Sequence, residues 1–132
     1  MKRKQEFMLP GLPTPISHYC DAVQWGDLLF ISGMAPIDAQ GRVVSDDVVA
    51  QTRQVFENLK AALDAASASF ADVLKVTVYL TDVNDRVKIN PVRKEYFGEA
   101  RPASTLIGIN QLAIPGMKVE IEAVVGLHNQ KG

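Results

Sequence analysis

The stretch Met117-Lys-Val-Glu-Ile-Glu-Ala-Val-Val125 decides the fold class, because apolar and polar side chains alternate along it. Alternation with a period of two is typical of a strand that is buried on one face only. The pattern places Val119, Ile121 and Ala123 on one face and Lys118, Glu120 and Glu122 on the other. The segment is therefore predicted to be a strand with one face in the core.

Four more strands precede this segment. Residues 21–25 and 28–32 flank a Gly26-Asp27 turn and predict a hairpin. Residues 73–80 are rich in β-branched side chains. Residues 104–109 complete the set.

Two helices are predicted between these strands. The longer one spans residues 46–67, where apolar side chains recur at helical spacing behind an acidic start. A second helix falls between about residues 84 and 97. Proline disrupts the interior of a helix but fits its first turn, so Asn90 is predicted to cap the main part, with Pro91 just inside. Gly98 is predicted to end it.

The element order is ββαβαββ, which predicts a single α+β domain over residues 1–132 with a mixed sheet and both helices on one face. Residues 1–16 hold three prolines and are predicted to be extended or looped. The other face of the sheet is expected to carry Phe30, Val78 and Tyr79. Because such side chains are seldom left in water, oligomerisation through this face is predicted.

Composition narrows the function classes. The chain has 132 residues and a net charge of -1, so no general field attracts nucleic acid or a membrane surface. Cys20 is the only cysteine, which excludes an internal disulfide and favours a cytoplasmic location. His18 and His128 are too few for a metal cage. We therefore expect a cytoplasmic, metal-free protein that binds neither nucleic acid nor membranes.

Several motifs, in their joint order and spacing, resemble one family. They are Gly26-Asp-Leu-Leu-Phe-Ile-Ser-Gly33, Gln51-Thr-Arg-Gln-Val-Phe-Glu-Asn-Leu59, Thr77-Val-Tyr-Leu-Thr-Asp82, Glu95-Tyr-Phe-Gly98, Arg101-Pro-Ala103 and Val119-Glu-Ile-Glu-Ala123. The chain resembles the Rid family, also called the YjgF family. The resemblance implies a chorismate-mutase-like fold, a homotrimer with a cleft between subunits, and cofactor-free hydrolysis of small enamines or imines to a ketoacid and ammonia.

The resemblance also assigns roles to six residues. Glu120 matches the glutamate that positions the attacking water, and Tyr19, Gly33 and Asn90 match residues around the ligand. Ser104, followed by Thr105, stands where many members carry the arginine that binds the substrate carboxylate. The chain thus resembles a branch that lacks this arginine, and weak binding of a substrate carboxylate is expected.

Other interpretations remain open at this stage. Pattern alone favours Glu120 as a solvated side chain on an edge-facing strand. Arg101 is expected to point away from Ser104 by strand alternation. Arg53 is expected to pair with Glu57 along one helix. The alternative to a deaminase is a non-catalytic small-molecule-binding or regulatory trimer. An endoribonuclease or translation inhibitor is disfavoured by the near-neutral charge.

Overall fold

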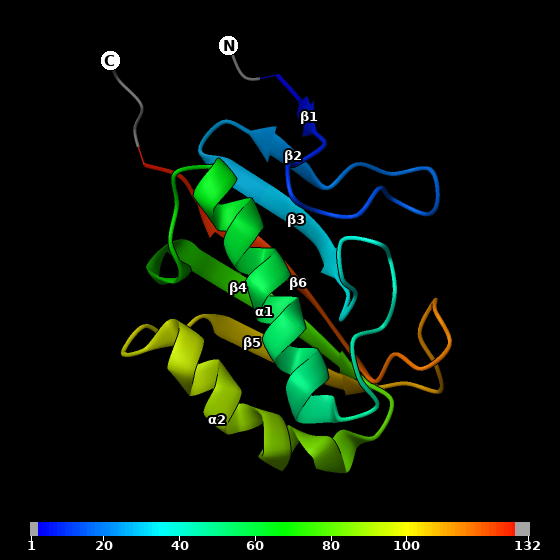
Figure 1. Ribbon diagram of the computed structural model, residues 1–132. Coiled ribbons are helices and arrows are strands. Elements are labelled where there is room, and N and C mark those ends of the chain that lie inside the picture. Colours follow the sequence, from blue (N-terminus) through cyan, green and yellow to red (C-terminus); the bar gives the residue numbers. More distant parts are fainter. Residues whose placement is uncertain (1–2, 129–132) are drawn as a thin grey trace.

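The computed structural model describes residues 3–128, which form one six-stranded sheet and two long helices (Figure 1). The elements are β1 (Gln5–Phe7), β2 (Ala22–Trp25), β3 (Leu28–Met34), α1 (Val48–Ala65), η1 (Phe70–Asp72), β4 (Val73–Leu80), η2 (Val83–Asp85), α2 (Arg86–Phe97), β5 (Ala103–Gly108) and β6 (Val119–Gly126). The predicted domain limits at residues 1 and 132 lie outside the described part. Within residues 3–128, no helix is long and apolar enough to cross a membrane.

The strands lie in the order β1-β2-β3-β6-β4-β5. Neighbouring strands are antiparallel except β4 and β5, which are parallel and are joined through α2. The predicted mixed sheet and the α+β fold class are therefore confirmed. The last strand of the chain, β6, lies in the middle of the sheet, so its side chains have neighbours on both sides.

Both helices lie on the same side of the sheet, as predicted (Figure 1). Val119, Ile121 and Ala123 face the helices and are buried, so the alternation read from β6 is also confirmed. Val78, predicted to share the uncovered face with Tyr79, is instead fully buried beneath the helices. Consecutive strand residues point to opposite faces, so these two cannot share one.

The N-terminal segment contributes a strand that the predicted element order lacks. β1 adds to the edge of β2, with Glu6 opposite Val23. The backbone N–H of Asp21 donates to the Phe7 carbonyl at 3.0 Å, which fixes the end of this strand. A three-residue strand has too few side chains to show a period, so its partner strand defines it.

The first helix follows its sequence signals closely. It lies inside the predicted range, and its N-cap is Asp47, whose carboxylate accepts from the Ala50 N–H at 2.9 Å. Gln51 is fully buried and joins the helix start to the approach to β6. Its side-chain amide donates to the Gly116 carbonyl at 2.9 Å and accepts from the Lys118 N–H at 2.8 Å.

The second helix lies within the predicted range of about residues 84–97, but its regular part begins before the predicted cap at Asn90. The short helix η2 leads directly into α2 at Arg86, so Asn90 is not a cap and Pro91 lies inside the helix. A proline here leaves the carbonyl four residues earlier without its helical partner. That carbonyl belongs to Val87, a highly exposed residue, so water can bond to it. Gly98 ends the helix as predicted, with φ of 61°.

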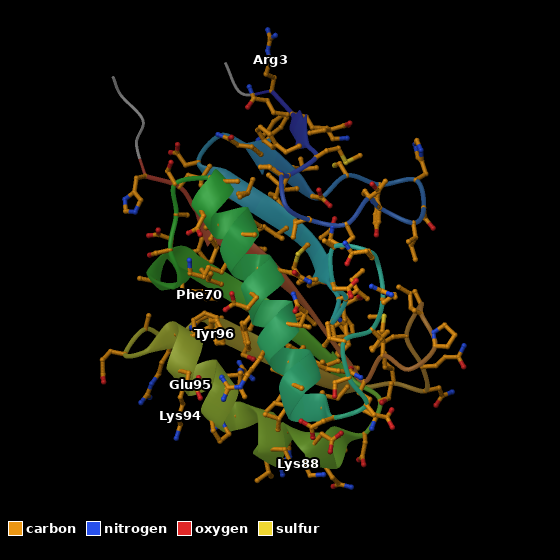
Figure 2. The ribbon with its side chains drawn as sticks, in the orientation of Figure 1. Arg3, Phe70, Lys88, Lys94, Glu95 and Tyr96 are labelled. Carbon is orange, nitrogen blue, oxygen red and sulfur yellow. The ribbon has the colours of Figure 1, made fainter. Side chains whose placement is uncertain are left out.

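Side chains between the two helices hold α2 against α1. Tyr96 stacks on Phe56 with ring centroids 5.0 Å apart, and its hydroxyl donates to Glu57 at 2.6 Å. Figure 2 shows Tyr96 near Phe70 and Glu95. Arg53 bonds both carboxylate oxygens of Glu95, at 2.6 and 2.8 Å. The predicted Arg53–Glu57 pair is thus wrong, because the neighbouring helix offers a two-pronged partner.

Candidate active site

Glu120 is a half-buried carboxylate in the middle of the sheet. The interpretation of its strand as edge-facing is wrong, since β6 lies between β3 and β4. Burial raises the pKa of Glu120 above its ordinary value, and the nearby charge of Glu122 adds to the increase. Glu122 itself is exposed and accepts a hydrogen bond from the Tyr79 hydroxyl at 2.9 Å. Two carboxylates on one strand face therefore have different environments.

Gly33 makes room for the Glu120 side chain. A Cβ atom at position 33 would lie 2.7 Å from the Glu120 Oε1 atom and 2.8 Å from its Cδ atom. Real Cβ atoms do not come this close to other heavy atoms, so any larger residue would displace the carboxylate. The β3 backbone around Gly33 departs from regular pairing between Ile31 and Met34. The glycine is therefore required by the close approach of the carboxylate.

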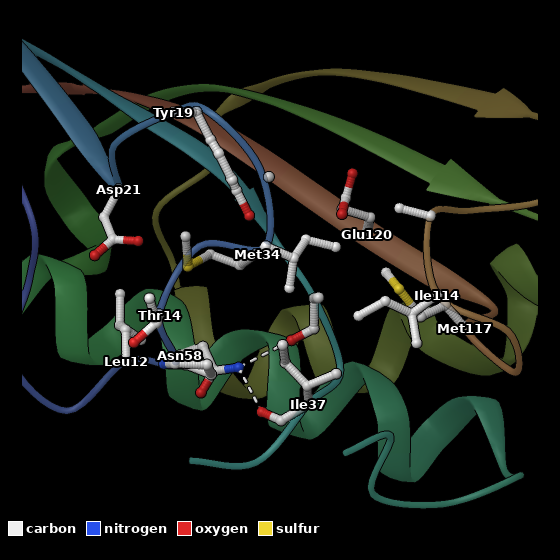
Figure 3. Close-up of a pocket in the computed structure, with 15 residues that line it drawn as sticks. Leu12, Thr14, Tyr19, Asp21, Met34, Ile37, Asn58, Ile114, Met117 and Glu120 are labelled. Carbon is white, nitrogen blue, oxygen red and sulfur yellow. Dashed lines mark hydrogen bonds between the residues drawn. The ribbon is translucent and has the colours of Figure 1, made fainter. Parts of the chain in front are cut away.

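Tyr19, Gly33 and Glu120 line one pocket of about 80 Å³, which we call the Glu120 pocket (Figure 3). Its remaining wall is mainly apolar and comes from the N-terminal loop, α1 and the loop before β6. The other lining residues are Leu12, Pro13, Thr14, Ile16, Asp21, Met34, Ala35, Ile37, Asn58, Ala113, Ile114 and Met117. The volume is well below that of a drug-sized ligand site, so the pocket suits a metabolite of a few heavy atoms.

Two other polar side chains of the Glu120 pocket serve the fold. Asp21 is buried and its carboxylate accepts from the Leu9 N–H at 2.7 Å. Asn58 donates to the carbonyls of Ala35 and Ile37 at 2.9 and 3.0 Å, as Figure 3 shows. Both groups fasten loops around the pocket. Within residues 3–128 no group donates a hydrogen bond to Glu120, whose carboxylate is left for a ligand or water.

Asn90 and Ser104 lie elsewhere, in a groove of about 620 Å³ that we call the Arg93 groove. Its other lining residues are Arg93, Lys94, Phe97, Gly98, Glu99, Ala100, Arg101 and Pro102. The Nη2 atom of Arg93 donates to the Ser104 hydroxyl at 2.9 Å. The sequence interpretation missed Arg93, although its helical spacing from Asn90 and Phe97 puts all three on one face of α2.

Two further positions depart from expectation. Arg101 lines the same groove as Ser104, because β5 begins only at Ala103 and strand alternation does not extend to Arg101. Thr105 faces the uncovered side of the sheet, where its hydroxyl lies 2.6 Å from the Lys75 ammonium. The structure therefore brings three of the six predicted residues together, places two in the Arg93 groove and separates Thr105 from both.

The described residues contain no cluster of three His, Cys, Asp or Glu side chains that would hold a metal ion. Cys20 is half-buried, and its thiol lies 3.5 Å from the Ala22 carbonyl, as expected for a packing residue. His18 is exposed. Asp21 and Asn58 are engaged in the fold, so the side chains of the Glu120 pocket that remain for chemistry are the Glu120 carboxylate, the Tyr19 phenol and the Thr14 hydroxyl.

A family model and several known proteins match this chain, and the matches agree on one family. A family model described as Endoribonuclease L-PSP matches residues 11–127. A RutC family protein of Pyrococcus horikoshii is 46% identical over 92% of this chain and 96% of its own. A 2-iminobutanoate/2-iminopropanoate deaminase of Salmonella typhimurium is 35% identical over 85% of this chain and 89% of its own.

Among solved structures, a Rid family protein of unknown function from Yersinia pestis superposes with a TM-score of 0.89 at 30% identity. The match covers 95% of this chain and all of that one. The agreement in fold extends over the whole sheet and both helices. The chain therefore belongs to the endoribonuclease L-PSP family, which is the Rid, or YjgF, family that its sequence resembles.

Proposed function

We propose that this protein is a hydrolytic deaminase of a small imine or enamine, with Glu120 as the group that positions and activates water. The observation that supports this most is the Glu120 carboxylate itself, which is half-buried, accepts no hydrogen bond from residues 3–128 and lines a small, mostly apolar pocket. Because burial raises the pKa of Glu120, its carboxylate is a stronger base than a solvated one and is better suited to accept a proton from water and return it. The deaminase relative from Salmonella typhimurium supports the same reaction class.

Hydrolysis of an imine requires one group that can accept and return protons. The Glu120 carboxylate accepts a proton from water as the water oxygen bonds to the imine carbon. The protonated carboxyl then returns this proton to the nitrogen, which gives a carbinolamine. The carboxylate next takes the hydroxyl proton of the carbinolamine and passes it to the nitrogen, so that the carbonyl forms, the carbon–nitrogen bond breaks and ammonia leaves. An enamine first takes a proton on carbon to become the imine. No metal or redox cofactor is needed for this sequence.

We further propose that the protein is a homotrimer in which the Glu120 pocket of one subunit meets the Arg93 groove of the next. Large apolar side chains on the uncovered sheet face support the assembly, because they would otherwise stay in water. They are Trp25, Leu28, Phe30 and Ile107. Such an arrangement would reunite Glu120 with Asn90 and Ser104, which one chain keeps apart. Light scattering should give three times the mass of one chain, and a monomer would contradict it.

A coupled assay of ammonia release tests the activity. Wild-type protein is mixed with freshly generated 2-aminoacrylate, 2-iminopropanoate or 2-iminobutanoate. Glu120→Gln should lower the rate roughly 100-fold, because the amide cannot take a proton from water. Glu122→Gln is the matched control on the same strand face and should keep most activity. Equal losses in both variants would assign the effect to general surface charge and refute the role of Glu120.

A non-catalytic role is the second candidate, supported by Ser104 at the position where the resembled family carries arginine. In that case the same trimer binds a small metabolite without turning it over. Saturable binding with no ammonia release from any tested imine would favour this role. Cleavage of a single-stranded RNA probe that Glu120→Gln abolishes would instead favour the endoribonuclease activity named in the family description.

A further inference from the structure

Arg93 is a half-buried cation without an acidic partner. Within residues 3–128, no carboxylate lies in ion-pair distance of its guanidinium, whereas Arg53 on the neighbouring helix has Glu95. Its protein contact is the neutral Ser104 hydroxyl. Burial lowers the pKa of Arg93 from its ordinary value, yet a guanidinium stays charged at neutral pH. A charge taken partly out of water in this way is stabilised when an anion binds beside it.

The neighbours of Arg93 favour a small anion rather than a neutral ligand. Arg93, Lys94 and Arg101 give the groove three cations, against one carboxylate from Glu99. Ser104 uses an oxygen lone pair to accept from Arg93, which leaves its own hydrogen for donation. The guanidinium has five N–H donors in one plane, so several remain after the bond to Ser104. Two adjacent residues of the groove lining therefore have donors left for a ligand.

We propose that Arg93 and Ser104 together form a binding site for a small carboxylate. The inference rests on the proposed function and adds to it the residue, Arg93, that would hold the substrate carboxylate in this chain. A planar fork of N–H groups matches the two oxygens of a carboxylate, and the serine hydroxyl adds a third donor. The Arg93 guanidinium on α2 thus lies next to Ser104. We therefore expect stronger carboxylate binding than the missing arginine at position 104 suggested.

Binding of two inert probes tests the site without relying on turnover. Propanoate and propanamide have nearly the same shape and differ in charge, so their affinities, measured by calorimetry on the intact protein, isolate the carboxylate contribution. Wild type should bind propanoate more tightly. Arg93→Gln should weaken propanoate binding roughly ten- to hundredfold and leave propanamide unchanged. Unchanged propanoate affinity in a folded Arg93→Gln protein overturns the proposal.

Three variants guard against misleading outcomes. Arg101→Gln removes the same charge from the same groove and should weaken propanoate binding by only about twofold, since Arg101 is exposed. An equal loss would mean that the groove attracts anions generally. Arg93→Lys keeps the charge without the fork and should bind at intermediate strength. Arg93→Gln combined with Ser104→Arg moves the guanidinium to the neighbouring position and should restore most of the affinity.

Two additional results separate this inference from the proposed function. If propanoate binding depends on Arg93 but no imine is hydrolysed, the carboxylate site stands and the deaminase proposal falls. If imines are hydrolysed at a rate that Arg93→Gln does not change in KM or kcat, the deaminase stands and the carboxylate site falls. Inorganic phosphate is the third probe, and Arg93-dependent binding of phosphate tighter than that of propanoate would overturn the assignment to carboxylates.

Discussion

The Glu120 pocket and the Arg93 groove are opposites in shape and charge. The first is small and mainly apolar, and its carboxylate, that of Glu120, has no donor among the described residues. The second is wide and basic, and its half-buried guanidinium, that of Arg93, has no acidic partner in the same part of the chain. In the proposed reaction, the carboxyl group would transfer the proton and the guanidinium would bind the charged substrate. The Glu120 pocket contains the carboxylate and the Arg93 groove contains the guanidinium, and the two regions lie apart within one chain.

Mixed trimers give the largest expected effect and test whether the two regions work in different subunits. Glu120→Gln and Arg93→Gln chains carry different tags, are co-expressed, and trimers with both tags are isolated. Each parent should be nearly inactive. The mixed trimer should regain about one third of the wild-type rate, because one interface in three combines an intact Glu120 with an intact Arg93.

The control uses trimers in which all three chains carry the same substitution but bear the two different tags. No recovery in the mixed trimers, with wild-type chains assembling normally, would mean that the two regions do not share a site across subunits. Recovery well above one third would mean that one of the parent variants was already active.

Gly33→Ala tests the geometry of the Glu120 pocket alone. The new Cβ atom would meet the carboxylate at 2.7 Å, so Glu120 must rotate away from its present position. We expect the deaminase rate to fall roughly tenfold, since small misplacements of a catalytic group are costly, while propanoate binding in the Arg93 groove changes little. Gly126→Ala is the matched control on a neighbouring strand, because its nearest contact would be an ordinary 3.4 Å. A full rate in Gly33→Ala would show that the carboxylate need not lie against the glycine.

The smallest effect concerns the stability cost of the buried acid. Because burial raises the pKa of Glu120, the folded protein binds its proton more tightly than the unfolded chain does. Ionisation therefore destabilises the fold above the raised pKa. Glu120→Gln should melt at a slightly higher temperature at pH 7, by a few degrees at most. The difference should shrink as the pH falls through the raised pKa, and a difference that grows in acid would contradict this sign.

Sequence reasoning succeeded where one face of an element is buried. The alternation in β6 and the apolar stripe of α1 reflect burial directly, so both could be predicted from residue spacing. The three-residue β1 could not, since its hydrogen bonds come from β2 rather than from a pattern of its own. The range of α2 was predicted, but its cap was placed wrongly at Asn90, because the sequence alone does not show that Val87, whose carbonyl loses its helical partner to Pro91, is an exposed residue.

For the site, the residues themselves were easier to find than their arrangement. Tyr19, Gly33 and Glu120, which the resemblance assigned to one site, line a single pocket of the structure. Arg93 was not among the predicted site residues, because its partner Ser104 is on a strand eleven residues later and only the packing of α2 beside β5 brings them together. A contact of this kind leaves no periodic signal. The structure is needed to find it.

The loop between β1 and β2 has a consequence for how such a protein can change. Leu12, Thr14 and Ile16 form one wall of the Glu120 pocket, yet this loop is fastened largely by the buried Asp21, through Leu9 and Phe7. The residues of this wall belong to a loop, whereas the rest of the fold is formed by the sheet and the two helices. New substrate sizes can be accommodated by exchanging this short segment, while the strand that carries Glu120 and the helices that stabilise it keep their sequence.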